Sequence, residues 1–387
     1  MGFRQYKAYH FIAGSTEGIE MTDVLSIRVT RVKDAKSNSA EILVNNYNKG
    51  AFIGGDFKYN TDDIVKIYAT EGLVDITDGT HLLGVFFIKN HDVQSDNRSV
   101  KLVLGDNTYK LLNRVYSGDF TTLTARDIIF NIIQVADSDG LNQNNVTVSM
   151  DTLQSGGGAF PLIEYAASNK TAYDVIHELS QPEFTGDTRA YIFWFDESGV
   201  FYWIYPGQTV VGTLTYGGAD MISSSFTRNE AETISSIIYN AGGNLNGGTI
   251  LELYHDPSST STNIKYKTML DINQAVRIIF KNLHSLADTT NATLLTAVTN
   301  DEFEAAVNIL ARSRAQKYIS VFSRGLWEAK IDSTGMRYTM GALYTVVENI
   351  NKFSPPSLRV SRIVHTMDKN GWNTQLSLSE DTDEIAA

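Results

Sequence analysis

Histidines and acidic clusters are the side chains of this sequence that could carry out catalytic or metal chemistry. The chain has 7 histidines, but none stands in a helical His-x-x-x-His pair. His177-Glu178 is not followed by the second histidine that a zinc protease needs, so we expect His177 to be a partly buried helix residue. The acidic turns at Asp62-Asp63 and Asp75 to Gly79 lack the alternating ligands of a calcium loop. We interpret both as solvated turns.

Hydrolase and phosphate-binding motifs are also missing. A glycosidase needs two convergent carboxylates, one of them in an apolar setting. Asp196 and Glu197 fall in a predicted hairpin turn, where both should stay hydrated and ionised. The sequence contains no Gly-x-Ser-x-Gly elbow, and no Gly-Lys-Ser/Thr follows the glycine-rich loop from Gln154 to Ala159. We therefore predict no enzyme activity, no catalytic, cofactor-binding or metal-binding residue, and no cofactor. Catalytic groups that converge from distant positions would escape this argument.

Composition excludes further classes of protein. The chain has 387 residues, enough for about two to four domains of about 100–200 residues. It carries 44 acidic and 32 basic residues, a net charge of -12, and no run of Lys or Arg. Specific nucleic-acid binding is therefore disfavoured. The absence of cysteine excludes a disulfide scaffold. We expect no membrane span, because no apolar run approaches about 20 residues.

Residues 1–118 show the pattern of short strands and turns. The strands are expected at Val24–Val32, Ala40–Val44, Ile64–Ala69, Gly84–Ile88 and Val100–Leu104. This pattern predicts a small barrel or sandwich. Because Val85 to Ile88 are apolar at successive positions, we expect protein to cover both faces of that strand.

Two helices with the same type of N-terminus are predicted in the middle of the chain. Thr124 can cap one helix, with Asp127 in its first turn. Ile128, Ile129, Ile132, Ile133 and Ala136 then form one apolar stripe. Thr171 and Asp174 repeat the arrangement in a second helix through Leu179. The likeness is explained equally well by an internal repeat and by the general preference for such caps.

An aromatic hairpin follows the second helix. Its strands run from Tyr191 to Phe195 and from Phe201 to Tyr205, with a turn at Asp196 to Gly199. We favour cross-strand packing as its role. The alternatives are a sugar-stacking platform and a partner interface.

The rest of the chain alternates strands with an insertion. A β-pattern covers residues 226–239, a polar stretch covers 240–263, and a helix is predicted from Asp301 to Tyr318. Strands and turns return over 322–378. The expected fold class is therefore α+β and β-rich.

One hairpin pattern occurs twice in the chain. Ile88 leads through a polar turn, from His91 to Ser99, into Val100–Leu104. Ile363 leads through a turn at Asp368–Gly371 into Thr374–Leu378. We predict that the two second strands are equivalent. Alternation in the last strand places one face on a core and the other on water or a lumen. The core-facing residues are Trp372, Thr374, Leu376 and Leu378.

With these motifs in place, the chain resembles the baseplate hub proteins of contractile-tailed bacteriophages, which include late control proteins and the hub portion of secretion-system spike proteins. The resemblance spans most of the chain. It is carried by Thr171–Leu179 with the aromatic hairpin, Arg228–Glu230 with Tyr239–Gly243, Gly341–Val347, Leu358–His365 and Gly371–Leu378.

The resemblance implies a homotrimer in which each chain carries two tube-like antiparallel β-barrel domains. These would be residues 1–118, and 213–243 with 325–387. Between them would lie an α+β middle domain, 119–212, and an insertion with a loop and a helix, 244–324. Three chains would then present six similar modules to a six-fold tail tube.

The implied role is a symmetry adaptor between the six-fold tube and a three-fold central spike, with a channel for DNA. Fused spike proteins continue into a β-helical tip, whereas this chain stops nine residues after Leu378, so we expect a separate spike polypeptide. Tail tube or distal tail proteins and baseplate wedge proteins are the other expected partners. The implied location is the virion tail baseplate, assembled in the host cytoplasm. If acidic and polar groups line the channel, DNA would not adhere to it.

Two alternatives remain open at this point. A receptor- or glycan-binding tail protein would use exposed rings of Trp194 and Trp203 as a stacking platform. A cell-wall hydrolase would clear a peptidoglycan suspension.

Overall fold

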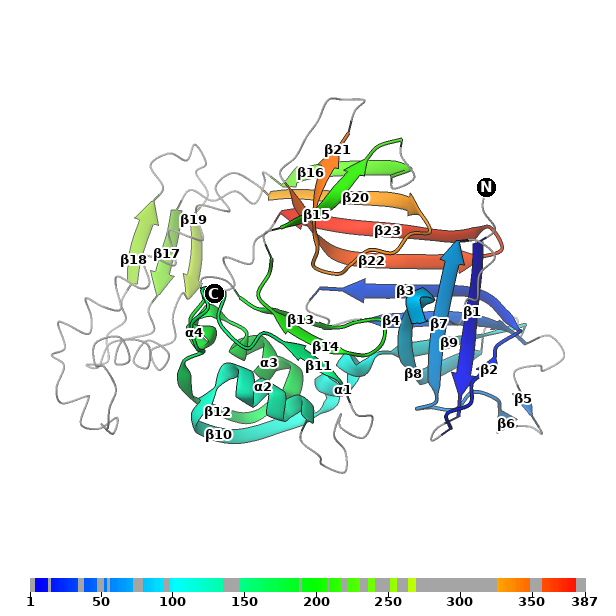
Figure 1. Cartoon of the computed structure of the whole chain (residues 1–387), viewed down its shortest axis with the longest axis horizontal. Helices are drawn as coiled ribbons and strands as arrows, with labels where there is room; N and C mark the ends of the chain where they lie inside the picture. The colour runs from blue at the N-terminus through cyan, green and yellow to red at the C-terminus, as the bar shows by residue number, and fades with distance from the viewer. Residues whose placement is uncertain are drawn as a thin grey trace.

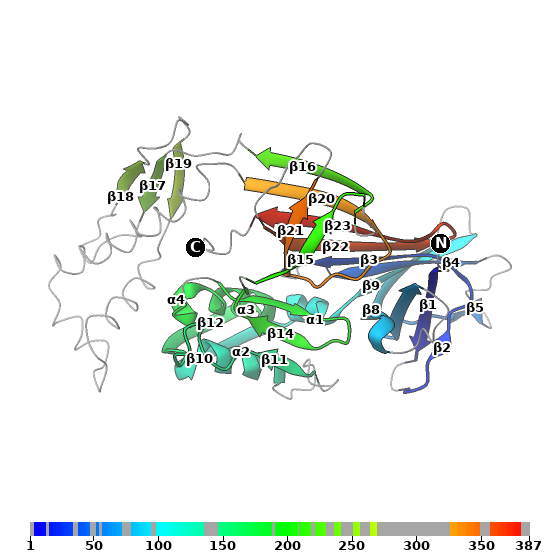
Figure 2. The same cartoon turned by 45° about the horizontal axis from the view of Figure 1, so that its top comes forward.

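The computed structural model is dominated by one large β-sheet beside a smaller α+β body (Figures 1 and 2). The residues that it describes are 4–12, 15–33, 38–46, 52–53, 56–71, 79–93, 98–134, 146–187, 190–207, 209–217, 221–229, 236–240, 251–255, 264–268, 326–348 and 357–380. No helix among them is long and apolar enough to cross a membrane.

Segments from both ends of the chain build the large sheet. The first part of the chain contributes β1 (Arg4–Phe11), β2 (Ile19–Glu20), β3 (Val24–Val32), β4 (Ser39–Asn45), β7 (Ile64–Glu71), β8 (Leu82–Val93) and β9 (Ser99–Gly105). The later part contributes β15 (Val210–Thr215), β16 (Ser223–Asn229), β20 (Leu326–Thr334), β21 (Leu343–Val347), β22 (Leu358–Asp368) and β23 (Gly371–Glu380). Beside them lie the short strands β5 (Phe52–Ile53) and β6 (Asp56–Phe57) and the 3₁₀ turn η2 (Gly79–His81).

The two parts join where β22 pairs antiparallel with β3, from Arg362 opposite Val32 to Met367 opposite Ile27. This pairing, called the seam below, makes a single sheet of 13 strands. The described strands of these two parts lie in one continuous sheet, and their pairings close neither half into a separate barrel.

The two halves of the sheet have the same strand order. The first half runs β1-β7-β8-β9-β4-β3, and the second runs β15-β21-β22-β23-β20-β16. The six long strands of each half can be numbered by their order along the chain, which leaves out the short β2 and the separate strands between β16 and β20. With this numbering, both halves have the spatial order first, fourth, fifth, sixth, third, second. The directions agree except that β15 and β21 are parallel, whereas β1 and β7 are antiparallel. An order with these crossovers in both halves indicates an internal repeat.

The register of the hairpins confirms that Val100–Leu104 and Thr374–Leu378 are equivalent strands. One residue is bulged at the same point of each hairpin, Lys89 in β8 and Ser361 in β22. The corresponding pairs are Leu104 with Ile88 and Ala40 in the first half, and Leu378 with Val360 and Ala329 in the second.

The turn before the fourth strand repeats as well. Asp62 and Gly341 both have a φ of 71°. Their amides donate to the carbonyl oxygens of Ile88 at 2.9 Å and Val360 at 3.1 Å. A positive φ favours glycine, and aspartate is one of the few other residues that adopt it readily. The backbone of the repeat is thus retained although the residue differs.

Two separate cores lie along the sheet. One contains the inward side chains of the first half together with Met367 and Trp372 from the second. The other lies in the second half, where β15 and β21 run across the direction of β20, β22 and β23 (Figures 1 and 2). In β23 Trp372, Thr374, Leu376 and Leu378 are buried, which confirms the predicted alternation.

The middle of the chain forms the smaller body. Its helices are α1 (Asn107–Asn113), α2 (Ala125–Gln134), α3 (Ala172–Leu179) and α4 (Pro182–Thr185). Its strands are β10 (Val115–Thr124), β11 (Val148–Met150), β12 (Leu162–Thr171), β13 (Ile192–Phe195) and β14 (Phe201–Ile204). β10 pairs with β12, and β14 lies between β11 and β13.

Both predicted helix caps are present. Thr124 Oγ1 accepts from the amide of Asp127 at 3.1 Å, and Thr171 Oγ1 accepts from that of Asp174 at 3.0 Å. Each hydroxyl in turn donates to the aspartate carboxylate at 2.7 Å. The predicted stripe of α2 is buried as far as Ile133, and Ala136 lies outside the described residues.

Three expectations for the elements need correction. The segment read as strands and turns contains α1, whose N-cap Asp106 accepts from the amide of Thr108 at 2.9 Å. The turn expected from His91 belongs partly to β8, because the bulge keeps that strand paired with β9 as far as Val93. The polar stretch 240–263 contains a strand.

That strand belongs to a separate three-stranded sheet. It is β18 (Leu251–His255), which pairs with β17 (Ser236–Asn240), and β17 also pairs with β19 (Ile264–Thr268). The β-pattern predicted over 226–239 is therefore divided between two sheets. The helix predicted from Asp301 to Tyr318 lies outside the described residues.

Candidate functional site

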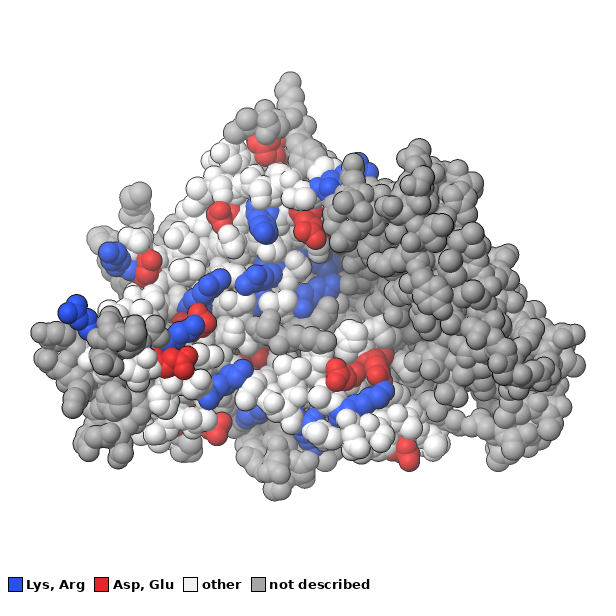
Figure 3. All heavy atoms as spheres, turned by 180° about the vertical axis from the view of Figure 1, so that it is seen from behind, with Lys and Arg blue, Asp and Glu red and all other residues white. Residues whose placement is uncertain are grey.

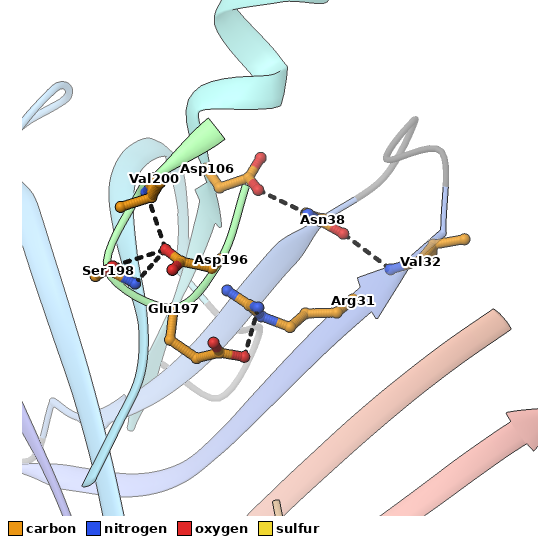
Figure 4. Close-up of polar contacts among 8 residues, drawn as sticks. All are labelled: Arg31, Val32, Asn38, Asp106, Asp196, Glu197, Ser198 and Val200. Atoms are coloured by element: carbon orange, nitrogen blue, oxygen red, sulfur yellow. Dashed lines mark hydrogen bonds and ion pairs between the residues drawn. The ribbon is translucent and has the colours of Figure 1, made fainter. Parts of the chain in front are cut away.

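The middle body contacts the large sheet through an ion pair close to the seam (Figure 4). Arg31 of β3 donates from Nη1 to Glu197 Oε1 at 2.7 Å. The arginine side chain is 5% exposed and the glutamate side chain 41%. Arg31 Nε is buried without a hydrogen-bond partner among the described residues. A buried guanidinium depends on its remaining partners, and Glu197 is the carboxylate that forms an ion pair with it.

The turn that carries Glu197 is held by its neighbour. Asp196 Oδ1 accepts from the amide of Ser198 at 2.9 Å, from its hydroxyl at 2.7 Å and from the amide of Val200 at 2.9 Å. Both carboxylates stay partly exposed, in line with the predicted hydration. In addition, Asp196 orders the turn and Glu197 reaches the sheet (Figure 4).

A second polar link connects the sheet to α1. Asn38 Nδ2 donates to Asp106 Oδ2 at 2.7 Å, while Asn38 Oδ1 accepts from the amide of Val32 at 2.8 Å. Burial raises the pKa of Asp106, while hydrogen bonds from Asn38 and Thr108 and the charge of Arg31 act in the opposite direction. One amide side chain therefore couples the end of β3 to the helix N-terminus. Asn38, Asp106, Arg31 and Glu197 are called the junction cluster below.

A buried histidine lies at the seam itself. His365 of β22 is 4% exposed. Its Nδ1 accepts from Trp372 Nε1 at 3.2 Å and lies 2.9 Å from Thr374 Oγ1. Burial, followed by the charges of Arg31 and Arg337, lowers the pKa of His365 to about 3. The ring is therefore neutral at physiological pH.

The first half contains another buried polar pair, which corrects the interpretation of Asp63 as part of a solvated turn, whereas Asp62 is exposed as predicted. Asp63 is 2% exposed, and its Oδ2 lies 2.7 Å from His10 Nε2. The same oxygen accepts from the amide of Asn60 at 3.0 Å. Turn propensity alone does not reveal a histidine from β1 that is distant in sequence. The turn at residues 75–79 lies mostly outside the described residues.

The remaining candidates are placed as structural or surface residues. His177, expected to be partly buried, is exposed and stacks on Tyr173 at 6.2 Å between ring centroids. The glycine-rich loop is fixed to α4 by a hydrogen bond in which Gln154 Nε2 donates to Thr185 O at 2.6 Å. Among the residues that the structure describes, no group of three or more His, Asp or Glu side chains could hold a metal.

The aromatic hairpin packs on both of its faces. Phe193 and Phe195 belong to the core of the middle body, whereas Ile192 and Trp194 belong to that of the second half-sheet. Trp203 is fully buried and Trp194 is 9% exposed. The glycan-platform alternative needs these two indoles at the surface, so the structure contradicts it. Tertiary packing is the role of this hairpin.

On the face seen in Figure 3, the charges of the described residues show no polyanion-binding patch. On the side of the molecule seen in Figure 3, basic and acidic side chains of the described residues are interspersed. In the large sheet, Lys101 of β9 pairs with Glu41 of β4, with 2.6 Å between Nζ and Oε1. The hydrogen bonds of the junction cluster connect β3 and the segment before β4 to α1 and to the hairpin turn. Its chemistry holds one part of the chain against another.

The fold agrees with that of phage tail proteins of known structure. A tail protein from Neisseria meningitidis MC58 matches with a TM-score of 0.62 and 11% identity, covering 98% of each chain. The 43 kDa tail protein of prophage MuSo2 from Shewanella oneidensis matches with a TM-score of 0.63 and 13% identity, covering 99% of each chain.

A third match comes from a secretion system. The E. coli protein c3393, a type VI secretion component described as similar in structure to the T4 tail proteins gp27 and gp5, has a TM-score of 0.50 and 8% identity. The match covers 99% of this chain and 78% of that one. The fold is therefore that of phage tail and baseplate-like proteins, as the sequence resemblance implied. No family model and no curated protein matches the sequence itself.

Proposed function

We propose that this chain is the structural hub of a phage tail baseplate. In this role it forms a homotrimer that joins the six-fold tail tube to a three-fold central spike and lines the channel through which DNA passes. It has no catalytic task. Its partners are tail tube or distal tail proteins, a separate spike protein and baseplate wedge proteins. Its place is the virion, after assembly in the host cytoplasm.

The observation that carries this proposal is the shared strand order of the two half-sheets. A protein that adapts three-fold to six-fold symmetry needs two similar modules in each chain, so that three chains imitate six. The bulges at Lys89 and Ser361 show that the similarity extends to single residues. We take the half-sheets as the two tube-like domains, the first within residues 1–118 and the second formed by β15, β16 and β20 to β23.

The junction cluster supports the same role. A channel wall must keep its two modules at a fixed angle. The seam joins the modules to each other, the Arg31–Glu197 pair joins the first to the middle body, and Ile192 and Trp194 pack on the core of the second. This arrangement supplies rigidity through a long sheet and buried polar contacts rather than through a reactive site.

Mass measurement of the full chain tests the proposal. The expected result is a trimer, either for the chain alone at high concentration or when it is co-expressed with the spike protein of its phage. Particle imaging should then show three copies below a six-fold tube. A chain that remains monomeric under both conditions would contradict the proposed function.

A further inference from the structure

The seam shows how one half-sheet of this protein attaches to another. It joins β22, the fifth long strand of the second half, to β3, the second long strand of the first. In the repeat, β8 of the first half corresponds to β22, and β16 of the second half corresponds to β3. Within one chain these counterparts are not paired with each other. Each chain therefore carries both strands of a second seam, at two different places.

Each counterpart strand has a stretch that pairs with a described strand on one side only. β7 pairs with β8 only as far as Phe87, so the segment from Asn90 to Val93 has β9 on one side and no described strand on the other. β16 is the last strand of the sheet, next to β20 and on the side away from β3 (Figures 1 and 2). Backbone groups at such edges readily pair with another chain.

We propose that β8 of one copy pairs antiparallel with β16 of a second copy and reproduces the seam between chains. This inference rests on the proposed trimeric hub and identifies the strands that build it. The existing seam gives the register. In the seam Thr30 lies opposite Val364, which is three residues after the bulged Ser361. In β8 the residue three after the bulged Lys89 is Asp92. The equivalent pair between copies is Thr227 opposite Asp92.

Burial at the neighbouring position supports this register. In the seam Val29 lies opposite His365, and these residues are 0% and 4% exposed. Their counterparts are Phe226, which is partly buried, and Val93, which is 47% exposed. Pairing β8 with β16 of a second copy would place Val93 beside Phe226 of that copy and remove its apolar surface from water.

The geometry of such a contact is head-to-tail. A chain uses β8 towards one neighbour and β16 towards the other, so copies add in one direction until the rotation closes a ring. In a trimer six half-sheets would alternate between seams within a chain and seams between chains. The repeat would then form a continuous wall.

Disulfide trapping tests the register directly, because the chain contains no cysteine of its own. We expect the double variant Asp92→Cys with Thr227→Cys to form disulfides between chains on oxidation, giving a ladder that ends at three chains in a denaturing gel. Paired residues in adjacent strands lie within the Cα distance that a disulfide needs.

Two matched variants calibrate this experiment. Asn90→Cys with Ser225→Cys is offset by four residues, or about 13 Å along the strand, and should not cross-link. Arg28→Cys with Thr366→Cys, which are opposite each other in the existing seam, should form a disulfide within the chain and no ladder. This second control reports that the oxidation conditions are adequate.

A charged substitution at the edge of β8 tests the contact independently of cross-linking, through its effect on self-association. Val93→Lys should weaken self-association at least tenfold, because its side chain would enter the new seam. Val115→Lys, at another apolar residue that is 64% exposed, should leave self-association unchanged. Circular dichroism verifies that both variants are folded.

The outcomes separate this inference from the proposed function. A ladder from the in-register pair, together with weakening by Val93→Lys alone, supports the β8–β16 contact. A trimer by mass in which only the offset pair cross-links, or neither pair does, overturns the contact and leaves the hub intact. If neither the chain alone nor the chain with its spike self-associates, the hub proposal fails and this inference fails with it.

Discussion

At the scale of single residues, burial decides which polar groups matter. Two glutamates illustrate this, since Glu197 and Glu41 are both 41% exposed and both pair with a basic side chain. Arg31, the partner of Glu197, is 5% exposed, whereas Lys101, the partner of Glu41, is 35% exposed. Removal of the glutamate leaves a buried charge in the first case and a hydrated one in the second.

Glu197→Ala should therefore lower the free energy of unfolding by about 2 kcal/mol, because Arg31 loses its compensating partner. Glu41→Ala, as the matched control, should cost less than about 1 kcal/mol. Urea unfolding followed by tryptophan fluorescence measures both. Equal losses for the two variants would contradict a special role of Glu197 at the junction.

His365 should make stability dependent on pH. Its pKa is lowered to about 3 in the folded protein, against 6.5 as the ordinary value. Between these values the unfolded chain binds the proton and the folded protein does not. The free energy of unfolding therefore falls as the pH decreases, by up to about 1.4 kcal/mol per pH unit.

His365→Gln should reduce this slope, because glutamine does not titrate. Denaturant unfolding at a series of pH values between about 6.5 and about 4 measures it. His177→Gln, at an exposed histidine, is the control and should keep the slope of the parent protein. An unchanged slope in His365→Gln would show that other groups cause the pH dependence.

At the scale of elements, the repeat keeps its backbone where side chains differ. Gly341 and Asp62 occupy the same turn with the same φ. A Cβ atom at Gly341 would meet Ile192 Cδ1 of the middle body at 2.9 Å, whereas one at Gly217, with a φ of 81°, would meet nothing within 4 Å. The turn of the second half is therefore packed as well as left-handed.

Gly341→Ala should lower the free energy of unfolding by about 2 kcal/mol, from the left-handed backbone and the contact with Ile192 together. Gly217→Ala carries the backbone cost alone and should lose about 1 kcal/mol. Chemical denaturation compares the two variants. A larger loss at Gly217 would mean that the close contact at Gly341 costs little.

At the scale of the whole molecule, the seam merges the two halves of the chain into one body. Met367 of β22 is fully buried in the core of the first half-sheet, together with residues of β4 and β9. The C-terminal hairpin is therefore part of the packing of the N-terminal half. Stability should be shared across the seam.

Met367→Ala should cost about 2–5 kcal/mol as a large-to-small change in a core. Hydrogen exchange followed by mass spectrometry should show faster exchange in β4 and β9 as well as in β22. An increase confined to β20, β22 and β23 would show that the two halves open independently.

Features that depend on neighbouring residues could be predicted from the sequence. The caps at Thr124 and Thr171 and the alternation of the last strand are set by side chains two to four positions apart. The equivalence of the two hairpins was also visible, because a repeat is a property of the chain itself. Helix α1 escaped prediction because its seven residues carry little periodicity.

The tertiary structure alone decided where distant segments meet. The seam unites β3 with β22 from opposite ends of the chain, and no local pattern encodes which strand edges pair. The burial of Arg31, Asp63 and His365 follows from the same long-range contacts, since each becomes enclosed only when a remote partner arrives. The repeated hairpin and the lack of recognisable catalytic motifs could thus be recognised from the sequence. The joining of the two half-sheets into one sheet, and the strand edges left at its ends, come from packing between residues far apart in the chain.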